Sequence, residues 1–285
     1  MSEKKRLVRQ ALAMPGVSLP RLPKGELFLT ESFINSIVRE EVGFVEKIEI
    51  VSSLLDLDLL AIPYERSILL SKGDIEPISS YFILLNIPGI FSVCVRRLGF
   101  FEAVKAIARN SDELLSVIEA HTREVLDKLP VTKECGFDGI SIVDDIAGNA
   151  GLFFPPSRFK SFFCPFLEKV VNMAKSKGLH VFFHSDGYLS EVLPEIAATG
   201  VDCLSTWDAQ AKMDVYKEKD RLSEKVSFIG TIDLLGWDKE KIEFEITRAE
   251  MVFKKGRMIL GSSCGLSTHI PYEKLSLLYP KIKLA

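Results

Sequence analysis

The sequence has few cysteines, and they are scattered along the chain without any motif that would pair them. The 285 residues include five cysteines, an odd number, and none of them stands in a CxxC arrangement. This pattern argues against a disulfide framework and predicts a protein of the reducing cytoplasm.

Long apolar runs and an excess of positive charge are also missing. The apolar runs at 54–62 and 82–91 are too short to span a bilayer. Arg9 and Gln10 interrupt the short N-terminal apolar stretch, so we expect no secretory signal. The net charge is −3, which gives no electrostatic case for nucleic acid. We therefore expect neither nucleic acid nor a membrane as a partner.

Short apolar runs alternate with longer amphipathic stretches along the whole chain, and 47% of the residues are hydrophobic. The runs predict eight strands, at 26–29, 56–62, 81–87, 139–143, 180–183, 202–205, 226–229 and 258–260. The stretches between them predict helices at 31–41, 112–129, 157–178, 189–199 and 237–254, with a last helix in the segment that begins at 271.

This alternation predicts parallel strands with right-handed crossovers. Eight repeats in 285 residues predict a single-domain TIM (β/α)8 barrel over residues 1–285, with an N-terminal extension at 1–25. A doubly wound open sheet is the alternative, although the first β-to-α turns lack GxGxxG and so do not support its dinucleotide-binding version.

Polar side chains gather where the predicted strands end, which is where the active sites of barrels lie. His184 and Cys264 follow the fifth and eighth strands, and Asp186 lies two residues after His184. An imidazole and a thiolate are good zinc ligands. The alternative is a hydrogen-bonded strand-end histidine and a small buried cysteine, which spacing alone favours.

Carboxylates follow other strands. Asp144 and Asp145 come after SIV, and either a site role or a structural role is open to them. Asp233 in GTID could bind substrate or cap the next helix, while Gly230 permits a sharp turn or a close approach to a ligand. Glu26 could act in the site, but pairing with Lys24 or exposure to solvent is the simpler interpretation.

Other residues are weaker candidates. Cys203 lies inside a strand and is expected in the core, His121 and His180 are not expected in a site, and His269 is a weak candidate at the mouth.

Several stretches, in order, resemble the uroporphyrinogen decarboxylase-like superfamily, which includes cobamide-dependent methyltransferases. They cover 137–275 and read DGISIVDDIAGNAGLFFPPSRFKSFFCPFLEKVV, KGLHVFFHSDGYLSEVLPEIAATGVDCLS, KVSFIGTIDLLG and RMILGSSCGLSTHIPYEKL. The resemblance implies a TIM barrel. The true decarboxylases carry an arginine-rich RQAGRY signature, and this chain has RLPKGELFLT in the corresponding region, which argues against porphyrin decarboxylation.

The methyltransferase branch carries a His-x-Cys motif and a later cysteine as zinc ligands. The resemblance therefore implies His184 and Cys264 as ligands, with Asp186 at the place of the middle cysteine. Asp186 is the expected third ligand, a group such as Glu26 is another candidate, and absence of the metal is the remaining alternative. Asp144, Asp145 and Asp233 would orient or protonate the substrate, and Gly230 and Asn149 are expected near a bound cofactor.

The HSDG motif resembles the enzymes that demethylate small methylated compounds. The implied function is zinc-dependent transfer of a methyl group between a small molecule and a corrinoid protein. That partner would supply methylcobamide, and tetrahydrofolate or a thiol coenzyme could take part. A uroporphyrinogen-type decarboxylase and a non-catalytic barrel that binds a tetrapyrrole or a partner are the alternatives. A second subunit, as in a homodimer, could cover the side of the last short helix.

Overall fold

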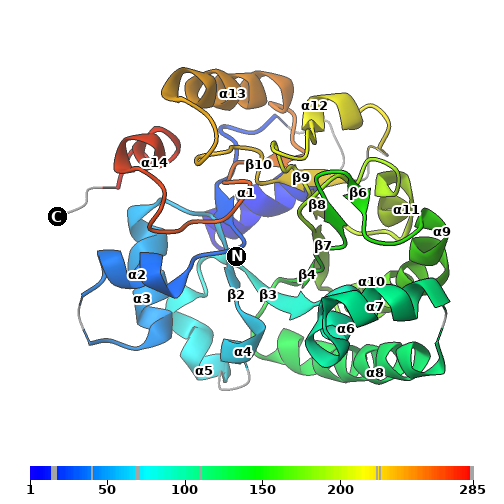
Figure 1. The fold of residues 1–285 in the computed structure, drawn as a ribbon. Coiled ribbons are helices and arrows are strands. Elements are labelled where there is room, and N and C mark those ends of the chain that lie inside the picture. The colour runs from blue at the N-terminus through cyan, green and yellow to red at the C-terminus, as the bar shows by residue number, and fades with distance from the viewer. Residues whose placement is uncertain are drawn as a thin grey trace. The chain divides into compact units, whose positions relative to one another are not determined.

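The structure is a computed structural model that describes residues 1–13, 18–39, 41–67, 71–109, 111–222, 224 and 226–282. Its main sheet has eight strands in the order β1-β2-β3-β4-β7-β8-β9-β10 (Figure 1). The strands are β1 (Gly25–Glu26), β2 (Leu59–Ile62), β3 (Phe82–Pro88), β4 (Gly139–Val143), β7 (His180–His184), β8 (Cys203–Ser205), β9 (Ser227–Ile229) and β10 (Met258–Ile259).

The predicted TIM-barrel-like α/β fold is confirmed. The paired strands β1–β2, β4–β7, β7–β8 and β9–β10 are parallel, and helices alternate with the strands along the chain. The first and last strands also meet, because Lys24 and Leu260 form a parallel bridge and the Gly25 amide donates to the Leu260 carbonyl at 2.8 Å. Each of the eight predicted strands overlaps an observed one, and β4 has the predicted bounds.

The chain divides into two compact units, residues 1–84 with 227–285, and residues 85–226. Each unit is described by itself. The first contains β1, β2, β9, β10 and the helices α1 (Glu3–Leu12), α2 (Glu31–Ile37), α3 (Phe44–Leu54), α4 (Tyr64–Ser67), α5 (Lys72–Ile75), α13 (Lys239–Val252) and α14 (Tyr272–Leu278).

The predicted N-terminal extension contains a packed helix, α1, which was not among the predicted helices. The Ser2 hydroxyl accepts a hydrogen bond from the Lys5 amide and caps the helix, and the apolar face of α1 is buried. The Ser227 hydroxyl and the Arg257 amide both donate to the Ala11 carbonyl at the helix end, at 3.0 and 2.8 Å. The helix therefore packs on the strands β9 and β10 of its own unit.

The second unit holds β4, β7 and β8 with the helices that cover them. These helices are α6 (Ile90–Leu98), α7 (Phe100–Arg109), α8 (Asp112–Glu134), α9 (Pro156–Arg158), α10 (Cys164–Ser176), α11 (Leu193–Ala198) and α12 (Val215–Glu218). The helix α8 packs on α6, α7 and α10. His121, on α8, is buried as a structural residue, with its Nε2 atom 2.7 Å from the Pro88 carbonyl oxygen and its ring stacked on Phe166.

Some helix bounds differ from those predicted. The predicted helix 157–178 is split into α9, a π-helical turn at Phe159–Phe163 and α10. Pro165 lies in the first turn of α10 and has no N–H to donate, so the regular hydrogen-bond pattern is broken just before it. The predicted helix 31–41 ends at Ile37, while α8 runs past its predicted end to Glu134. None of the helices in the described parts of the chain is long and apolar enough to span a membrane.

The strands have these positions because they are apolar on both faces. All the residues of β2 and β8 are buried, as are six of the seven in β3, which is typical of parallel sheets covered on both sides. The carboxylates Asp144, Asp145 and Asp186 lie just beyond the ends of β4 and β7.

Gly89 and Gly43 each precede a helix, and together they test the packing at the end of β3. Gly89 precedes α6, and a Cβ atom on it would lie 2.3 Å from the Cβ and Cγ atoms of Asp144. We expect Gly89→Ala to lower the free energy of unfolding by about 1–3 kcal/mol in urea titrations, because the core there cannot accept the extra carbon. Gly43 precedes α3 in the same way, and a Cβ atom there would meet nothing within 4 Å. Equal losses in Gly89→Ala and Gly43→Ala would contradict this assignment.

Candidate functional site

The register of three strands in the second unit brings polar residues to one level. Val143 of β4 pairs with His184 of β7, and His184 pairs with Ser205 of β8. The loops that follow these strands begin at the same edge of the sheet, because all three strands are parallel. Asp144–Asp145, Ser185–Asp186 and Thr206–Asp208 therefore emerge side by side.

Asp145, His184 and Asp186 form the candidate metal centre. The His184 Nε2 atom lies 3.7 Å from Asp145 Oδ1 and 3.8 Å from Asp186 Oδ1, and one ligand atom from each residue lies within 4.8 Å of the others. The imidazole is buried, while the two carboxylate side chains are 58% and 53% exposed. The cluster is therefore anchored in the sheet and open toward solvent, where a substrate could reach it.

Hydrogen bonds from backbone amides fix the loops that carry Asp145 and Asp186. The Asp186 amide donates to Asp145 Oδ1 at 3.0 Å, and the Gly187 amide donates to Asp208 Oδ2 at 3.2 Å. Gly187 has a φ of +90°, and a Cβ atom on it would lie 2.4 Å from the Ala147 carbonyl oxygen. Glycine is required here by both the backbone conformation and the close approach. The turn of the HSDG motif thus directs Asp186 back toward His184.

The residues present fit a divalent metal ion. Zinc binds imidazole nitrogen and carboxylate oxygen at about 2.0–2.2 Å, so two of its ligand atoms lie roughly 3–4 Å apart. The two distances from His184 Nε2 are in this range. Partial burial raises the pKa of Asp186, the carboxylates of Asp145 and Asp208 raise it further, and His184 opposes the shift. A cation between these groups would relieve the repulsion among the carboxylates.

Asp144 faces a different environment from its neighbour. It is buried, and its carboxylate accepts hydrogen bonds from the amides of Phe91 and Ser92 in the first turn of α6, at 3.2 and 2.8 Å. Burial raises the pKa of Asp144 to about 7, and the two amide donors oppose the shift. The structure therefore gives Asp144 a structural contact with α6, and its predicted part in catalysis stays a prediction.

Glu26 is neither paired with Lys24 nor exposed, so the simpler interpretation from the sequence was wrong. It is buried at the end of β1, and its carboxylate accepts hydrogen bonds from the amide and the hydroxyl of Ser262, both at 2.7 Å, and from the hydroxyl of Tyr279. Lys24 instead donates to the Leu278 carbonyl at 2.9 Å. Burial raises the pKa of Glu26 to about 7, although its three donors favour the ionised form.

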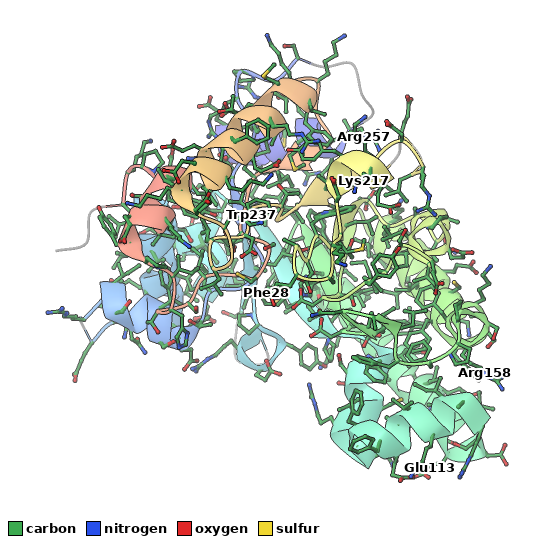
Figure 2. All side chains as sticks on the ribbon, turned by 45° about the horizontal axis from the view of Figure 1, so that its top comes forward. Phe28, Glu113, Arg158, Lys217, Trp237 and Arg257 are labelled. Atoms are coloured by element: carbon green, nitrogen blue, oxygen red, sulfur yellow. The ribbon has the colours of Figure 1, made fainter. Side chains whose placement is uncertain are left out.

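Cys264 lies in the first unit, on the loop after β10, and its side chain is exposed. The loop is fixed on both sides of Cys264, through Glu26 at Ser262 and through a hydrogen bond from the Leu266 amide to the Phe28 carbonyl at 2.8 Å. Figure 2 labels Phe28, which packs so closely on Gly265 that a Cβ atom there would lie 2.6 Å from Phe28 Cβ. The predicted closeness of Cys264 and His184 concerns both units and stays a prediction.

The remaining predicted residues have the following positions. Asp233 is buried and accepts hydrogen bonds from the amides of Leu235 and Gly236, at 3.1 and 2.7 Å, as a turn-capping aspartate does. Gly230 is buried with a φ of +75°. Asn149 is exposed in the turn between the short antiparallel strands β5 (Ala147–Gly148) and β6 (Gly151–Leu152). Their functional roles stay predictions, and Cys203 is buried as expected.

Sequence reasoning missed two residues of this site. Ser205 is buried at the end of β8, and its hydroxyl oxygen lies 3.1 Å from His184 Nδ1. Asp208 accepts hydrogen bonds from Gln210 and Gly187 and so ties the HSDG turn to the loop after β8. Asp208 could have been predicted from the sequence, because it is a carboxylate soon after a predicted strand. Ser205 is identified only by the pairing of β7 with β8.

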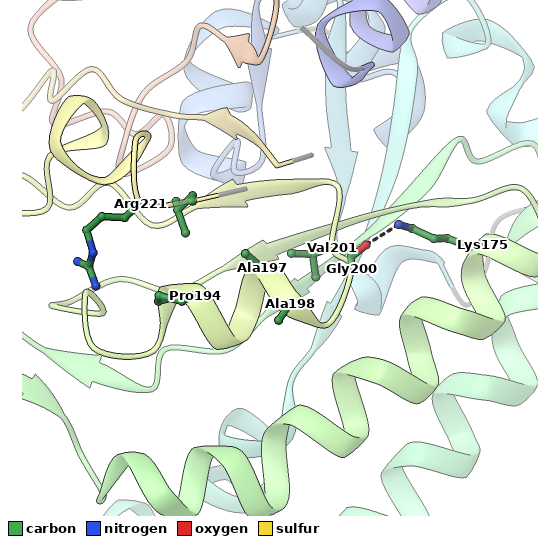
Figure 3. Close-up of a pocket in the computed structure, with 8 residues that line it drawn as sticks. Lys175, Pro194, Ala197, Ala198, Gly200, Val201 and Arg221 are labelled. Carbon is green, nitrogen blue, oxygen red and sulfur yellow. Dashed lines mark hydrogen bonds between the residues drawn. The ribbon is translucent and has the colours of Figure 1, made fainter. Parts of the chain in front are cut away.

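A groove of about 500 Å³ lies elsewhere in the second unit, along α11 (Figure 3). Small side chains form much of its wall, and Lys175 and Arg221 lie along it. The Lys175 ammonium is 3.3 Å from Asp202 Oδ1, and the Arg221 guanidinium is 2.7 Å from Glu218 Oε2. Both cations are therefore already paired, and the groove is not a candidate anion site.

Comparison with known proteins identifies the family. The family model described as uroporphyrinogen decarboxylase (URO-D) matches residues 88–283, so the chain belongs to the uroporphyrinogen decarboxylase family. No curated protein resembles the chain closely enough in sequence to count as a match.

Two solved structures are similar along nearly the whole chain. A methyltransferase from Methanosarcina mazei has a TM-score of 0.74 at 16% identity, covering 99% of this chain and 98% of its own. A structure from Listeria monocytogenes, provisionally assigned as a vitamin-B12-independent methionine synthase, has a TM-score of 0.55 at 10% identity, covering 95% and 97%. At these identities the likeness establishes a shared fold.

The buried Glu26 predicts a pH dependence of stability. The carboxyl has an ordinary pKa of 4.5 and a folded-state pKa of about 7, so the unfolded chain ionises first as the pH rises. Relative to Glu26→Gln, the free energy of unfolding should fall by up to about 3 kcal/mol between about pH 4.5 and about pH 7, and then stay level. Urea titrations across this range measure the difference. Glu113→Gln, which alters an exposed carboxylate on α8, is the control, and a difference that does not change with pH for Glu26→Gln would contradict the assignment.

Proposed function

We propose that this protein is a metal-dependent methyltransferase that moves a methyl group between a small methylated molecule and a corrinoid protein, with zinc as the metal. The observation that carries the proposal is the placement of Asp145 and Asp186 around His184 Nε2 at the carboxyl ends of the strands. Membership of the uroporphyrinogen decarboxylase family and the fold shared with a methyltransferase support it.

The proposed ligands are His184, Asp186 and Cys264. The first two lie together in the second unit, and Asp145 is a rival for the third position because it is already beside His184. A zinc ion bound there would act as a Lewis acid on the heteroatom that carries the methyl group, or would hold a thiol acceptor as thiolate.

The residues of the chain would then have separate tasks. His184 and the carboxylates position the reacting heteroatom, and Asp145, more than half exposed, can exchange a proton with it. In demethylation, the bond between the methyl carbon and the heteroatom breaks, and its electron pair stays on the heteroatom, which takes up a proton. The electron pair of the partner's cobalt(I) forms the new bond to carbon. Asp144 and Asp233 are proposed to orient or protonate the substrate, and Gly230 and Asn149 are proposed to lie near a bound cofactor.

A separate corrinoid protein is the proposed partner, since no cobamide-binding segment is evident in the sequence. Tetrahydrofolate, a thiol coenzyme or a methylated small molecule is the proposed second reactant. A cytoplasmic location and a homodimer belong to the same proposal.

Decarboxylation is the second candidate function, because the family model carries that activity in its name. The missing arginine-rich signature removes the expected anchors for porphyrin carboxylates. The two candidate functions differ in their need for a metal, because only methyl transfer requires zinc.

Metal content tests the ligand assignment. His184→Ala, Asp186→Asn and Cys264→Ala should each weaken zinc binding more than about 100-fold, because loss of a direct ligand should cost more than loss of a residue that supports one. Competition titrations with a chromophoric chelator measure the affinity. Asp127→Asn, an exposed carboxylate on α8, should leave it unchanged. Unchanged zinc stoichiometry in both His184→Ala and Cys264→Ala would refute the assignment, and loss of zinc in Asp145→Asn but not in Cys264→Ala would make Asp145 the third ligand.

Methyl transfer tests the function itself. The zinc-loaded protein should convert cob(I)alamin to methylcobalamin in the presence of a methyl ether, methylamine or methyl thioether, followed by the visible spectrum. We expect His184→Ala to lower the rate at least about 100-fold, since it removes a direct ligand of the proposed metal and with it the Lewis acid. Loss of carboxylates from uroporphyrinogen, with no methyl transfer from any of the three donor classes, would favour the decarboxylase instead.

A further inference from the structure

Ser205 faces the side of His184 that is turned away from the carboxylates. Its hydroxyl oxygen is 3.1 Å from His184 Nδ1, while Asp145 and Asp186 lie near Nε2. Both residues are buried, and the pairing of β7 with β8 places them opposite each other. The two ring nitrogens therefore have different neighbours, a hydroxyl on one side and two carboxylates on the other.

This arrangement bears on which nitrogen carries the proton in neutral imidazole. A nitrogen can bind a metal only through a free lone pair, so Nε2 must be without its proton when it faces a metal. Two carboxylates beside Nε2 would by themselves favour a proton there. A hydrogen-bond acceptor at Nδ1 opposes this, because it gives the proton a partner on the other nitrogen.

We propose that Ser205 is a positioning residue for His184: its hydroxyl accepts the Nδ1–H hydrogen bond, which holds the ring in place and directs the Nε2 lone pair between Asp145 and Asp186. The inference rests on the metal binding in the proposed function and deepens it. A serine hydroxyl can also donate, so the same residue can adapt when the metal is absent and the proton returns to Nε2.

The sheet supplies a matched control in Ser141. Ser141 on β4 pairs with Phe182 on β7, and Val143 pairs with His184 two residues further along both strands. Ser141 therefore lies on the same face of the sheet as His184, two residues farther from the strand ends. Its hydroxyl is buried and has no hydrogen-bond partner among the described residues. Ser141→Ala therefore removes a buried serine hydroxyl from the same sheet, as Ser205→Ala does, but it removes no hydrogen bond of His184.

The experiment compares zinc affinity in Ser205→Ala, Ser205→Thr and Ser141→Ala, without substrate or corrinoid. Ser205→Ala should bind zinc about 10–100-fold more weakly, the usual effect of removing a group that orients a metal ligand. Ser205→Thr keeps the hydroxyl in a residue suited to a strand and should recover most of the affinity. Ser141→Ala should bind zinc as the unaltered protein does.

A second measurement reads the tautomer directly. In the zinc-loaded protein, ¹⁵N NMR of the His184 ring should show the proton on Nδ1. Unchanged zinc affinity in Ser205→Ala, equal losses in Ser205→Ala and Ser141→Ala, zinc coordinated through Nδ1, or no zinc binding by the unaltered protein would each overturn the inference. Zinc binding that depends on Ser205 without any methyl transfer would instead support it while refuting the proposed function.

Discussion

The parallel register of β4, β7 and β8 is the constraint on which the candidate site depends. Val143, His184 and Ser205 stand level because the backbone hydrogen bonds of the sheet fix their pairing. A shift of one residue would turn His184 to the other face of the sheet and separate it from Ser205 and from both carboxylates. The buried apolar strands below therefore do more than stabilise the fold, since they set the positions of the polar atoms above them.

Adjacent carboxylates acquire opposite properties from this geometry. Asp144 turns into the protein and accepts two amides of α6, whereas Asp145 turns outward toward His184. The two carboxylates therefore face different hydrogen-bond partners, although they are adjacent in the sequence. Glu26 resembles Asp144, because its donors are a neighbouring loop and a tyrosine, and its buried carboxyl joins β1 to the segment after β10.

The sequence was sufficient for the strands and for His184 and Asp186, because buried parallel strands are continuous apolar runs with polar ends. The sequence was insufficient where the role of a residue depends on which strand or distant segment lies beside it. Ser205 is an ordinary strand-end serine until the register places it against His184, and Tyr279 lies 253 residues from Glu26. The β5–β6 hairpin has strands of two residues, too short for any periodicity to appear. The π-helical turn at Phe159–Phe163 lies just before Pro165. A proline shows that one backbone hydrogen bond is missing, but it does not show which helical form the preceding turn adopts.

The donor set also bears on the direction of the proposed chemistry. Cysteine thiolates are soft ligands that donate much charge to a metal, whereas carboxylates are hard and leave the metal more positive. Asp186 stands where the motif that the chain resembles has a cysteine. With Asp145 rather than Cys264 in the third position, the proposed metal would have two carboxylates beside His184. A metal held by such a set is a stronger Lewis acid toward an oxygen or nitrogen leaving group and a poorer host for a soft thiolate. In the proposed methyltransferase, this set of ligands would favour removing a methyl group from a small ether or amine over methylating a thiol.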